Sequence, residues 1–163
     1  MLTDLTTDER EELNELRAEM NIVRAGALRG SVVLIPRFGA SDTERTLFAA
    51  ILARKNNRAV ELPGGKPERG ESAYDAAKRE AEEELGVPVE VAVVPLGEFL
   101  HIYEGRVWLC TAYEGDLHGA HPRGSIEGDA TFATRTELLA GTYGPVVRRI
   151  LAAYDARKAG PRG

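Results

Sequence analysis

Glu80, Glu83 and Glu84 lie within five consecutive positions of this chain. An α-helix turns once in about 3.6 residues, so positions i, i+3 and i+4 share one face. Carboxylates gathered on one face repel each other, and an ordinary surface helix would interleave lysines among them. Hard divalent cations such as Mg²⁺ and Mn²⁺ prefer oxygen ligands. The spacing therefore predicts a metal site.

Glycines and one arginine surround these acids in a pattern that suits ion binding. Gly64 and Gly65 allow the backbone to bend tightly, and a carbonyl there can point at a bound ion. Gly70 permits a second sharp turn before the expected helix. Arg79 stands four residues before Glu83 and can fix a glutamate rotamer through a charge-assisted hydrogen bond. The segment as a whole therefore predicts a glycine loop that leads into an acidic helix.

Residues 65–87 read GKPERGESAYDAAKREAEEELGV and resemble the Nudix box, G-x5-E-x7-R-E-U-x-E-E-x-G-U, in which U is a bulky aliphatic residue. Ala81 is the one departure, because it is smaller than the usual aliphatic residue. That position faces the core in the family, so the departure concerns packing more than chemistry. The remaining fixed positions match at Gly65, Glu71, Arg79, Glu80, Glu83, Glu84, Gly86 and Val87.

The resemblance implies an α/β fold, a Nudix-like α/β/α sandwich around a mixed β-sheet. It also implies an enzyme that hydrolyses a pyrophosphate bond in a nucleoside diphosphate linked to a moiety X. Mg²⁺ would be the cofactor, with Mn²⁺ able to substitute. The substrate would be a small nucleotide, either a (d)NTP or a dinucleoside polyphosphate. The alternative is a non-catalytic, nucleotide-binding regulatory module, but such modules lose box glutamates and all four remain here.

Roles follow from the resemblance, residue by residue. Glu80 would be either a metal ligand or the base that activates water, and Arg79 would orient it. Glu71 would support the loop and the metal-bound waters. Metals lower the pKa of bound water and hold the oxygens of a phosphoryl displacement, which agrees with this assignment. The main metal ligands would be Glu83, Glu84 and the carbonyl of Gly65.

Four residues outside the acidic helix complete the candidate site. Glu127 would be a fourth metal-binding acid, and its alternative is a solvated loop residue. Lys66 adjoins the glycine loop and would bind phosphate, whereas Arg54 would either do the same or be solvated. Tyr103 follows the box by sixteen residues and resembles a tyrosine that stacks on a base in enzymes acting on dinucleoside polyphosphates. Its alternative is a packing tyrosine.

The elements that must position these residues can be predicted from caps and hydrophobic patterns. Ser72 and Asp75 form an N-cap pair and Gly86 suits a C-terminal cap, which predicts a helix over 73–85. Apolar runs predict strands at 31–37, 46–53, 59–62, 88–95, 106–113 and 130–133. Further helical segments are expected at 136–139 and 144–156. Loops that would set specificity are expected at 38–45, 54–58, 97–105 and 114–128.

The N-terminal segment predicts a separate helix. Thr6 and Glu9 fit a capping box, and apolar residues then recur at helical spacing at Leu13, Leu16, Met20 and Val23. The stripe would either pack on the body of the domain or form the contact of a homodimer. The expected organisation is a helical extension over 1–26, a Nudix hydrolase domain over 27–158 and a frayed tail over 159–163.

Composition narrows the function. The 163 residues suit one domain, and the formal net charge is −5. Segment 61–90 alone holds nine acidic and four basic residues, so duplex nucleic acid is a poor partner. No apolar run is long enough to span a membrane, and the acidic N-terminus resembles neither a signal nor a transit peptide. Cys110 is the only cysteine, which excludes internal disulfides. A cytoplasmic protein without membrane contact is expected.

Overall fold

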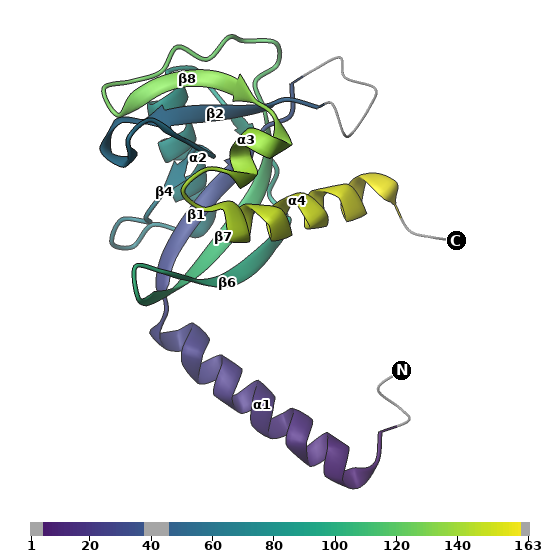
Figure 1. The fold of residues 1–163 in the computed structure, drawn as a ribbon. Helices are drawn as coiled ribbons and strands as arrows, with labels where there is room; N and C mark the ends of the chain where they lie inside the picture. Colours follow the sequence, from purple (N-terminus) through teal and green to yellow (C-terminus); the bar gives the residue numbers. More distant parts are fainter. Residues whose placement is uncertain (1–4, 38–45, 161–163) are drawn as a thin grey trace.

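Strand β7 (Arg106–Asp116) is the centre of a mixed sheet in the computed structural model, which describes residues 5–37 and 46–160 (Figure 1). Its neighbour β1 (Leu28–Leu34) runs parallel to it, and β4 (Gly64–Gly65) pairs antiparallel with the other edge of β1. Two more strands pair antiparallel with β7, namely β5 (Glu90–Val91) and β6 (Gly97–Tyr103). The mixed sheet is therefore confirmed.

A smaller antiparallel sheet lies beside the first. Its strand order is β3 (Ala59–Glu61), β2 (Phe48–Ala53) and β8 (Gly128–Ala133). A short 3-10 helix, η3 (Arg54–Asn56), joins β2 to β3. The remaining elements are α1 (Thr7–Gly26), α2 (Ala73–Leu85), α3 (Arg135–Leu139) and α4 (Gly144–Ala159).

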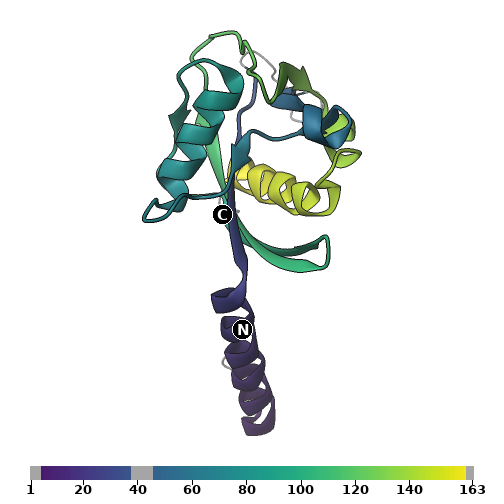
Figure 2. The same ribbon diagram turned by 90° about the vertical axis from the view of Figure 1, so that its left-hand side faces the viewer.

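Helices cover the two faces of the mixed sheet, with α2 on one side and α4 on the other (Figure 2). Successive residues of a strand point to opposite faces, and β1 shows this directly. Val33 belongs to the core that includes Leu85 of α2, whereas Leu34 belongs to the core that includes Ile150 of α4. All four of these side chains are almost completely buried. The predicted α/β/α sandwich is confirmed.

Helix α2 forms where its capping signals predict it. The Ser72 hydroxyl accepts a hydrogen bond from the backbone N–H of Asp75 at 3.0 Å, and Gly86 adopts a left-handed conformation with φ of 68°. Glycine adopts that conformation without a steric penalty, which explains the stop at this residue. Ala81 is fully buried, as expected from its place in the box. The helix therefore packs its apolar residues into the core, and its acidic face lies at the edge of that core.

Three expectations about the second half of the chain are wrong. Only Glu90–Val91 of the predicted strand 88–95 pairs in a sheet, because proline cannot donate a hydrogen bond to a ladder and two prolines flank this pair. Residues 97–103, expected as loop, form β6 and pair with β7 along their length. The expected loop 114–128 starts later, since β7 continues to Asp116. The expected loop at 38–45 lies outside the described residues.

Helix α1 has the predicted capping box, with Thr6 and Glu9 bonded reciprocally. The expectation that it packs on the domain is wrong, because none of its residues is buried and it extends away from both sheets (Figures 1 and 2). Only Ala27 separates it from β1. An ion pair between Arg24 and Glu98 of β6 ties its last turn to the sheet. Across the described ranges, no helix is long and apolar enough to cross a bilayer.

Candidate metal and catalytic site

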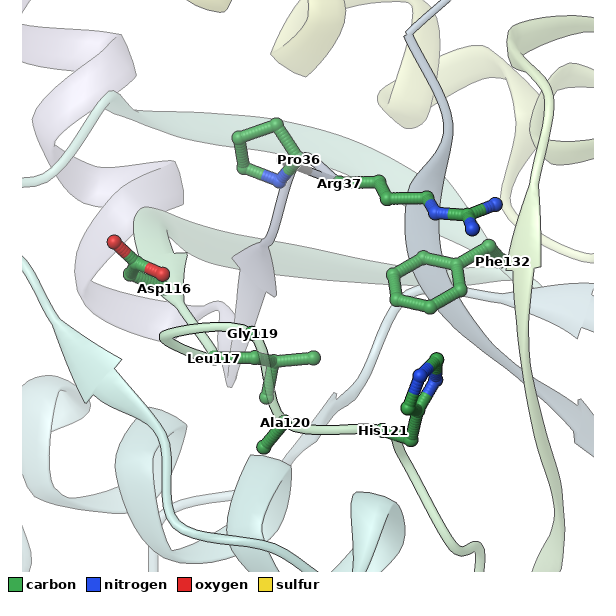
Figure 3. Close-up of a pocket in the computed structure, with 8 residues that line it drawn as sticks. All are labelled: Pro36, Arg37, Asp116, Leu117, Gly119, Ala120, His121 and Phe132. Carbon is green, nitrogen blue, oxygen red and sulfur yellow. The ribbon is translucent and has the colours of Figure 1, made fainter. Parts of the chain in front are cut away.

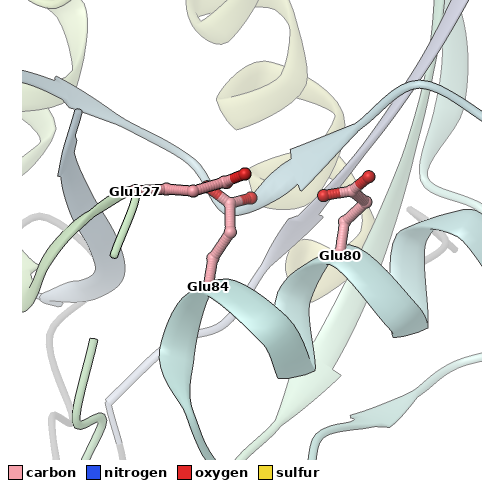
Figure 4. A group of neighbouring side chains, drawn as sticks. All are labelled: Glu80, Glu84 and Glu127. Atoms are coloured by element: carbon pink, nitrogen blue, oxygen red, sulfur yellow. The ribbon is translucent and has the colours of Figure 1, made fainter. Parts of the chain in front are cut away.

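Three carboxylates from two distant parts of the chain converge beside α2. Glu80 and Glu84 stand one helical turn apart, and Glu127 reaches them from the loop before β8 (Figure 4). One oxygen from each lies within 4.8 Å of the others. The structure thus brings together three of the five predicted metal ligands. The convergence of Glu127 is notable because it is 43 residues beyond Glu84 in the chain.

Glu84 is the most buried member of this acidic cluster, with 4% of its surface exposed. Its Oε1 accepts a hydrogen bond from the Gly64 N–H at 2.8 Å. The pKa of Glu84 is raised to about 8, mainly by burial and in addition by the nearby negative charges of Glu127, Glu80 and Glu61, while the Gly64 hydrogen bond opposes the rise. A buried carboxylate crowded by others is stabilised when a cation shares the site.

Gly65 leaves the space that Glu80 occupies. A Cβ at residue 65 would lie 2.5 Å from Cδ of Glu80, which is closer than real Cβ contacts allow. Burial raises the pKa of Glu80, and the hydrogen bond from Arg79 opposes that rise. The glycine of the loop is therefore required so that strand β4 and the Glu80 carboxylate can lie against each other.

Arg79 joins the acids of the helix to the loop. Its Nε and Nη2 donate to the two oxygens of Glu71 at 2.8 and 2.9 Å, and its Nη1 donates to Glu80 Oε1 at 2.9 Å. A bidentate guanidinium–carboxylate pair is among the strongest and most directional hydrogen-bonded contacts. It lowers the pKa of Glu71 to about 2 and raises the pKa of Arg79. Arg79 therefore fixes the orientation of Glu80, as its predicted role requires.

Glu71 shapes the loop that precedes α2. Its Oε1 accepts from the Glu68 N–H at 2.9 Å, and its own N–H donates to the Glu68 carbonyl at 2.9 Å. Arg79 Nη2 also reaches the carbonyl of Lys66 at 3.4 Å. The loop is thus held at several points by the residues that the box pattern singles out.

Glu83 lies apart from the acidic cluster. Its side chain is 61% exposed and contacts Arg79 Nη1 at 3.3 Å. It does not belong to the group of carboxylates whose oxygens meet within 4.8 Å, although the resemblance makes it a main metal ligand. In this structure it borders the site on the solvent side.

The backbone of Arg54 supports Glu127. Its N–H donates to the Glu127 carbonyl at 3.0 Å, while the N–H of Glu127 is bound by the Ser125 hydroxyl at 3.1 Å. Helix η3 therefore positions the loop that delivers the third carboxylate. The side chain of Arg54 is exposed, and this backbone role could not be read from its charge.

Lys66 and Tyr103, expected to bind substrate, each contact an aromatic residue. The Lys66 ammonium lies 5.1 Å above the centre of the Trp108 ring, within the range of a cation–π contact. The Tyr103 ring packs on Tyr143 with the ring centres 4.9 Å apart and the planes tilted by 58°. Burial raises the pKa of the Tyr103 hydroxyl. Each of the two side chains therefore has an aromatic neighbour, and Lys66 stays exposed to solvent.

Glu61 is a buried acid that sequence reasoning missed. It is 7% exposed at the end of β3, and its Oε1 accepts from the Asn56 side-chain amide at 2.5 Å. Its negative charge contributes to the raised pKa of Glu84 and of Tyr143, so it lies close to both the acidic cluster and the tyrosine pair. The available signal was one charged residue inside the apolar run AVEL, which precedes the glycine loop.

The acidic cluster fits a divalent cation. It offers only carboxylate oxygens, which are the donors that Mg²⁺ and Mn²⁺ prefer. Its most buried member, Glu84, has a pKa raised to about 8 by burial and by the neighbouring carboxylates, so a cation would stabilise its charged form. The absence of a side chain at Gly65 lets the Glu80 carboxylate take its place in this cluster.

A separate pocket of about 220 Å³ opens beside the loop that follows β7 (Figure 3). The Arg37 guanidinium lies 5.2 Å above the Phe132 ring at its edge. None of the acidic-cluster residues lines it, so it is distinct from the candidate metal site. Its lining consists of Pro36, Arg37, Asp116, Leu117, Gly119, Ala120, His121 and Phe132.

Comparisons with known proteins identify the family and the fold of the chain. The family model described as NUDIX domain matches residues 28–153. No curated protein sequence matches the chain. A Caenorhabditis elegans Ap4A hydrolase in a binary complex has a similar structure, with a TM-score of 0.69 and 16% identity over 83% of this chain and 100% of that chain.

Two further solved structures share the fold. A NUDIX hydrolase from Nitrosomonas europaea has a TM-score of 0.64 and 22% identity, covering 81% of this chain and 90% of its own. A MutT protein from Methanosarcina mazei Go1 has a TM-score of 0.63 and 20% identity, covering 83% and 96%. At these identities the likeness concerns the fold, while the family model covers most of the chain.

Proposed function

Because the chain belongs to the Nudix hydrolase family, whose members act on pyrophosphate bonds, we propose that it hydrolyses a nucleoside diphosphate linked to a moiety X with Mg²⁺ as its cofactor. The observation that carries this proposal is the meeting of Glu80, Glu84 and Glu127 within 4.8 Å. Two of these acids belong to the box, and the third comes from a separate loop.

The acidic cluster would hold the ion, together with Glu83 and the carbonyl of Gly65. When bound, the ion would lower the pKa of water and offset charge on the phosphate oxygens. Mn²⁺ offers the same preference for oxygen ligands and can replace Mg²⁺.

Glu80 is the proposed acceptor of the proton from the attacking water. A general base works best when its pKa lies near the working pH, and burial raises the pKa of Glu80 from its ordinary value. Arg79 holds one of its oxygens, so the other is left to contact water. Glu127 is the second candidate for this role because it reaches the same point from a different loop.

Substrate contacts are proposed for three side chains. Lys66 follows Gly65 directly and would pair with a phosphate group, and Arg54 would do so from the Glu127 side. Tyr103 would present the free face of its ring to a base. The Tyr103–Tyr143 pair favours a substrate with a nucleoside at that position, either a (d)NTP or a dinucleoside polyphosphate. A purely regulatory module is disfavoured, since all four box glutamates are present.

A substrate panel tests the proposal. Nucleoside triphosphates, ADP-ribose, NADH and diadenosine polyphosphates would be assayed for phosphate or pyrophosphate release with Mg²⁺ and with Mn²⁺. We expect metal-dependent hydrolysis of at least one nucleotide, abolished by EDTA. Glu84→Gln should lower its turnover by roughly 10²-fold or more.

The matched control is Glu82→Gln, which changes the same group on the same helix but outside the acidic cluster. Glu82 instead contacts Lys78 and the N–H of Val89. We expect it to keep the parent rate. Full activity of Glu84→Gln, or hydrolysis that persists in EDTA, would overturn the proposed metal site.

A further inference from the structure

Helix α1 presents an apolar stripe to solvent. Exposed fractions reach 52% at Leu16, 48% at Met20 and 42% at Val23, and Leu13 is half-buried on the same face. No residue of the helix is buried. Exposed isolated helices are only marginally stable in water, and most helices in proteins depend on packing of their apolar face. The stripe therefore lacks a covering surface within the described chain.

The stripe has the period of a two-helix seam. Its residues are separated by three, four and three positions, which corresponds to alternating a and d positions of a heptad. Leu13 and Met20 take the a positions, and Leu16 and Val23 take the d positions. Ile22, although 73% exposed, falls outside the seam.

Charges beside the seam indicate the partner and its direction. Glu12 and Glu19 occupy g positions, while Arg17 and Arg24 occupy e positions. In a parallel pair, a g residue faces the following e residue of the other helix; in an antiparallel pair, g residues face each other. The electrostatic interaction between the helices differs in sign in the two arrangements. A parallel self-pair brings Glu12 to Arg17 of the other copy, which is attractive, whereas an antiparallel self-pair brings glutamate to glutamate, which is repulsive.

Glu12 and Arg17 are available for such a pair, since neither forms an ion pair within the described chain. Arg24 is already paired with Glu98, which anchors the helix to its own sheet. The helix extends away from both sheets, so the body of its own domain does not cover it (Figures 1 and 2). We propose that α1 is a dimerisation element that pairs in parallel with α1 of a second copy of this chain.

Molar mass in solution tests the proposal. Sedimentation velocity or light scattering on the full chain should show twice the monomer mass as the concentration rises. Leu16→Glu should give a monomer at every concentration, because it places a charge in the seam. Ile22→Glu adds the same charge to the same helix outside the seam and should leave the dimer intact. Thermal unfolding would confirm that both variants keep a folded domain.

Charge exchange tests the direction. Glu12→Arg and Arg17→Glu should each weaken the dimer, and the double variant should restore it because the attraction is rebuilt with reversed signs. Restoration at low salt that fades at high salt would support the parallel pair. A chain that stays monomeric throughout, a dimer that survives Leu16→Glu, or a dimer strengthened by Glu12→Arg would each overturn the proposal.

Discussion

Gly65 shows how the absence of one side-chain carbon determines where the Glu80 carboxylate can lie in the site. A Cβ at this position would lie 2.5 Å from Cδ of Glu80, so Gly65→Ala must displace the carboxylate or the loop. We expect a fall in kcat of roughly 10–100-fold, the range found when a partner of a metal ligand is altered. Steady-state kinetics at saturating Mg²⁺ measures it. Gly26→Ala is the control, since a Cβ there meets nothing within 4 Å, and equal losses in both variants would contradict the steric explanation.

Arg79 makes a prediction about geometry rather than charge. Its guanidinium bonds both oxygens of Glu71 and one of Glu80, and a lysine ammonium cannot reproduce that fork. Arg79→Lys should therefore reduce kcat by roughly 10–100-fold while the domain stays folded. Arg69→Lys makes the same change on the exposed part of the same loop and should keep the parent rate. Full activity of Arg79→Lys would show that charge alone suffices.

Sequence reasoning at the residue scale succeeds where the determinants are local. The i, i+4 relation of Glu80 and Glu84 follows from helix periodicity, and the core position of Ala81 follows from the box pattern. The burial of Glu84 and the nearness of Glu61 depend on how β3 and the loop before β8 fold against α2. No pattern within α2 carries that information, and Glu83, which has the same chemistry, lies outside the acidic cluster.

At the scale of elements, the cap of α2 can be tested separately from the chemistry. The Ser72 hydroxyl accepts the Asp75 N–H at 3.0 Å, and removing an N-cap typically costs about 1 kcal/mol of stability. Ser72→Ala should lower the free energy of unfolding in urea by about that amount. Ser72→Asp keeps an acceptor at the cap and should keep the stability. Parent stability in Ser72→Ala would show that the cap adds nothing.

Elements also differ in how far a sequence can predict them. Helix α2 is bounded by Ser72 and Gly86, whose effects act within one turn, so its bounds are predicted closely. Strand β6 has no such signals, because its pairing with β7 across the turn at Glu104 and Gly105 decides its conformation. The segment of β6 is expected as a loop from its composition, but the turn residues and the pairing with β7 make it a strand.

For the whole molecule, the sandwich could be predicted but the place of α1 could not. The stripe at Leu16 and Met20 predicts that this face is covered, without stating by what. The domain covers both faces of its sheet with α2 and α4, so its own core has no place for a third helix. Whether such a stripe packs on its own domain or on another molecule depends on which faces of the domain other elements already cover.

Metal binding and folding should be coupled across the whole domain. The acidic cluster requires Glu127 to meet Glu80 and Glu84, which only the folded chain achieves. A ligand that binds only the folded state adds about 2.7 kcal/mol at 100 times its Kd. For a domain of this size that corresponds to a rise in Tm of roughly 5–10 °C. Differential scanning calorimetry with and without Mg²⁺ measures it.

Glu84→Gln separates metal binding from a general effect of salt. Without Mg²⁺ the variant should melt at or above the parent temperature, because it removes a carboxylate whose pKa is raised to about 8 by burial and by neighbouring charges. With Mg²⁺ it should gain less than the parent, since an amide is a weaker ligand than a carboxylate. The Glu82→Gln control should gain as much as the parent. An equal gain in all three proteins would show that Mg²⁺ acts outside the acidic cluster, and no gain in the parent would contradict a metal site there.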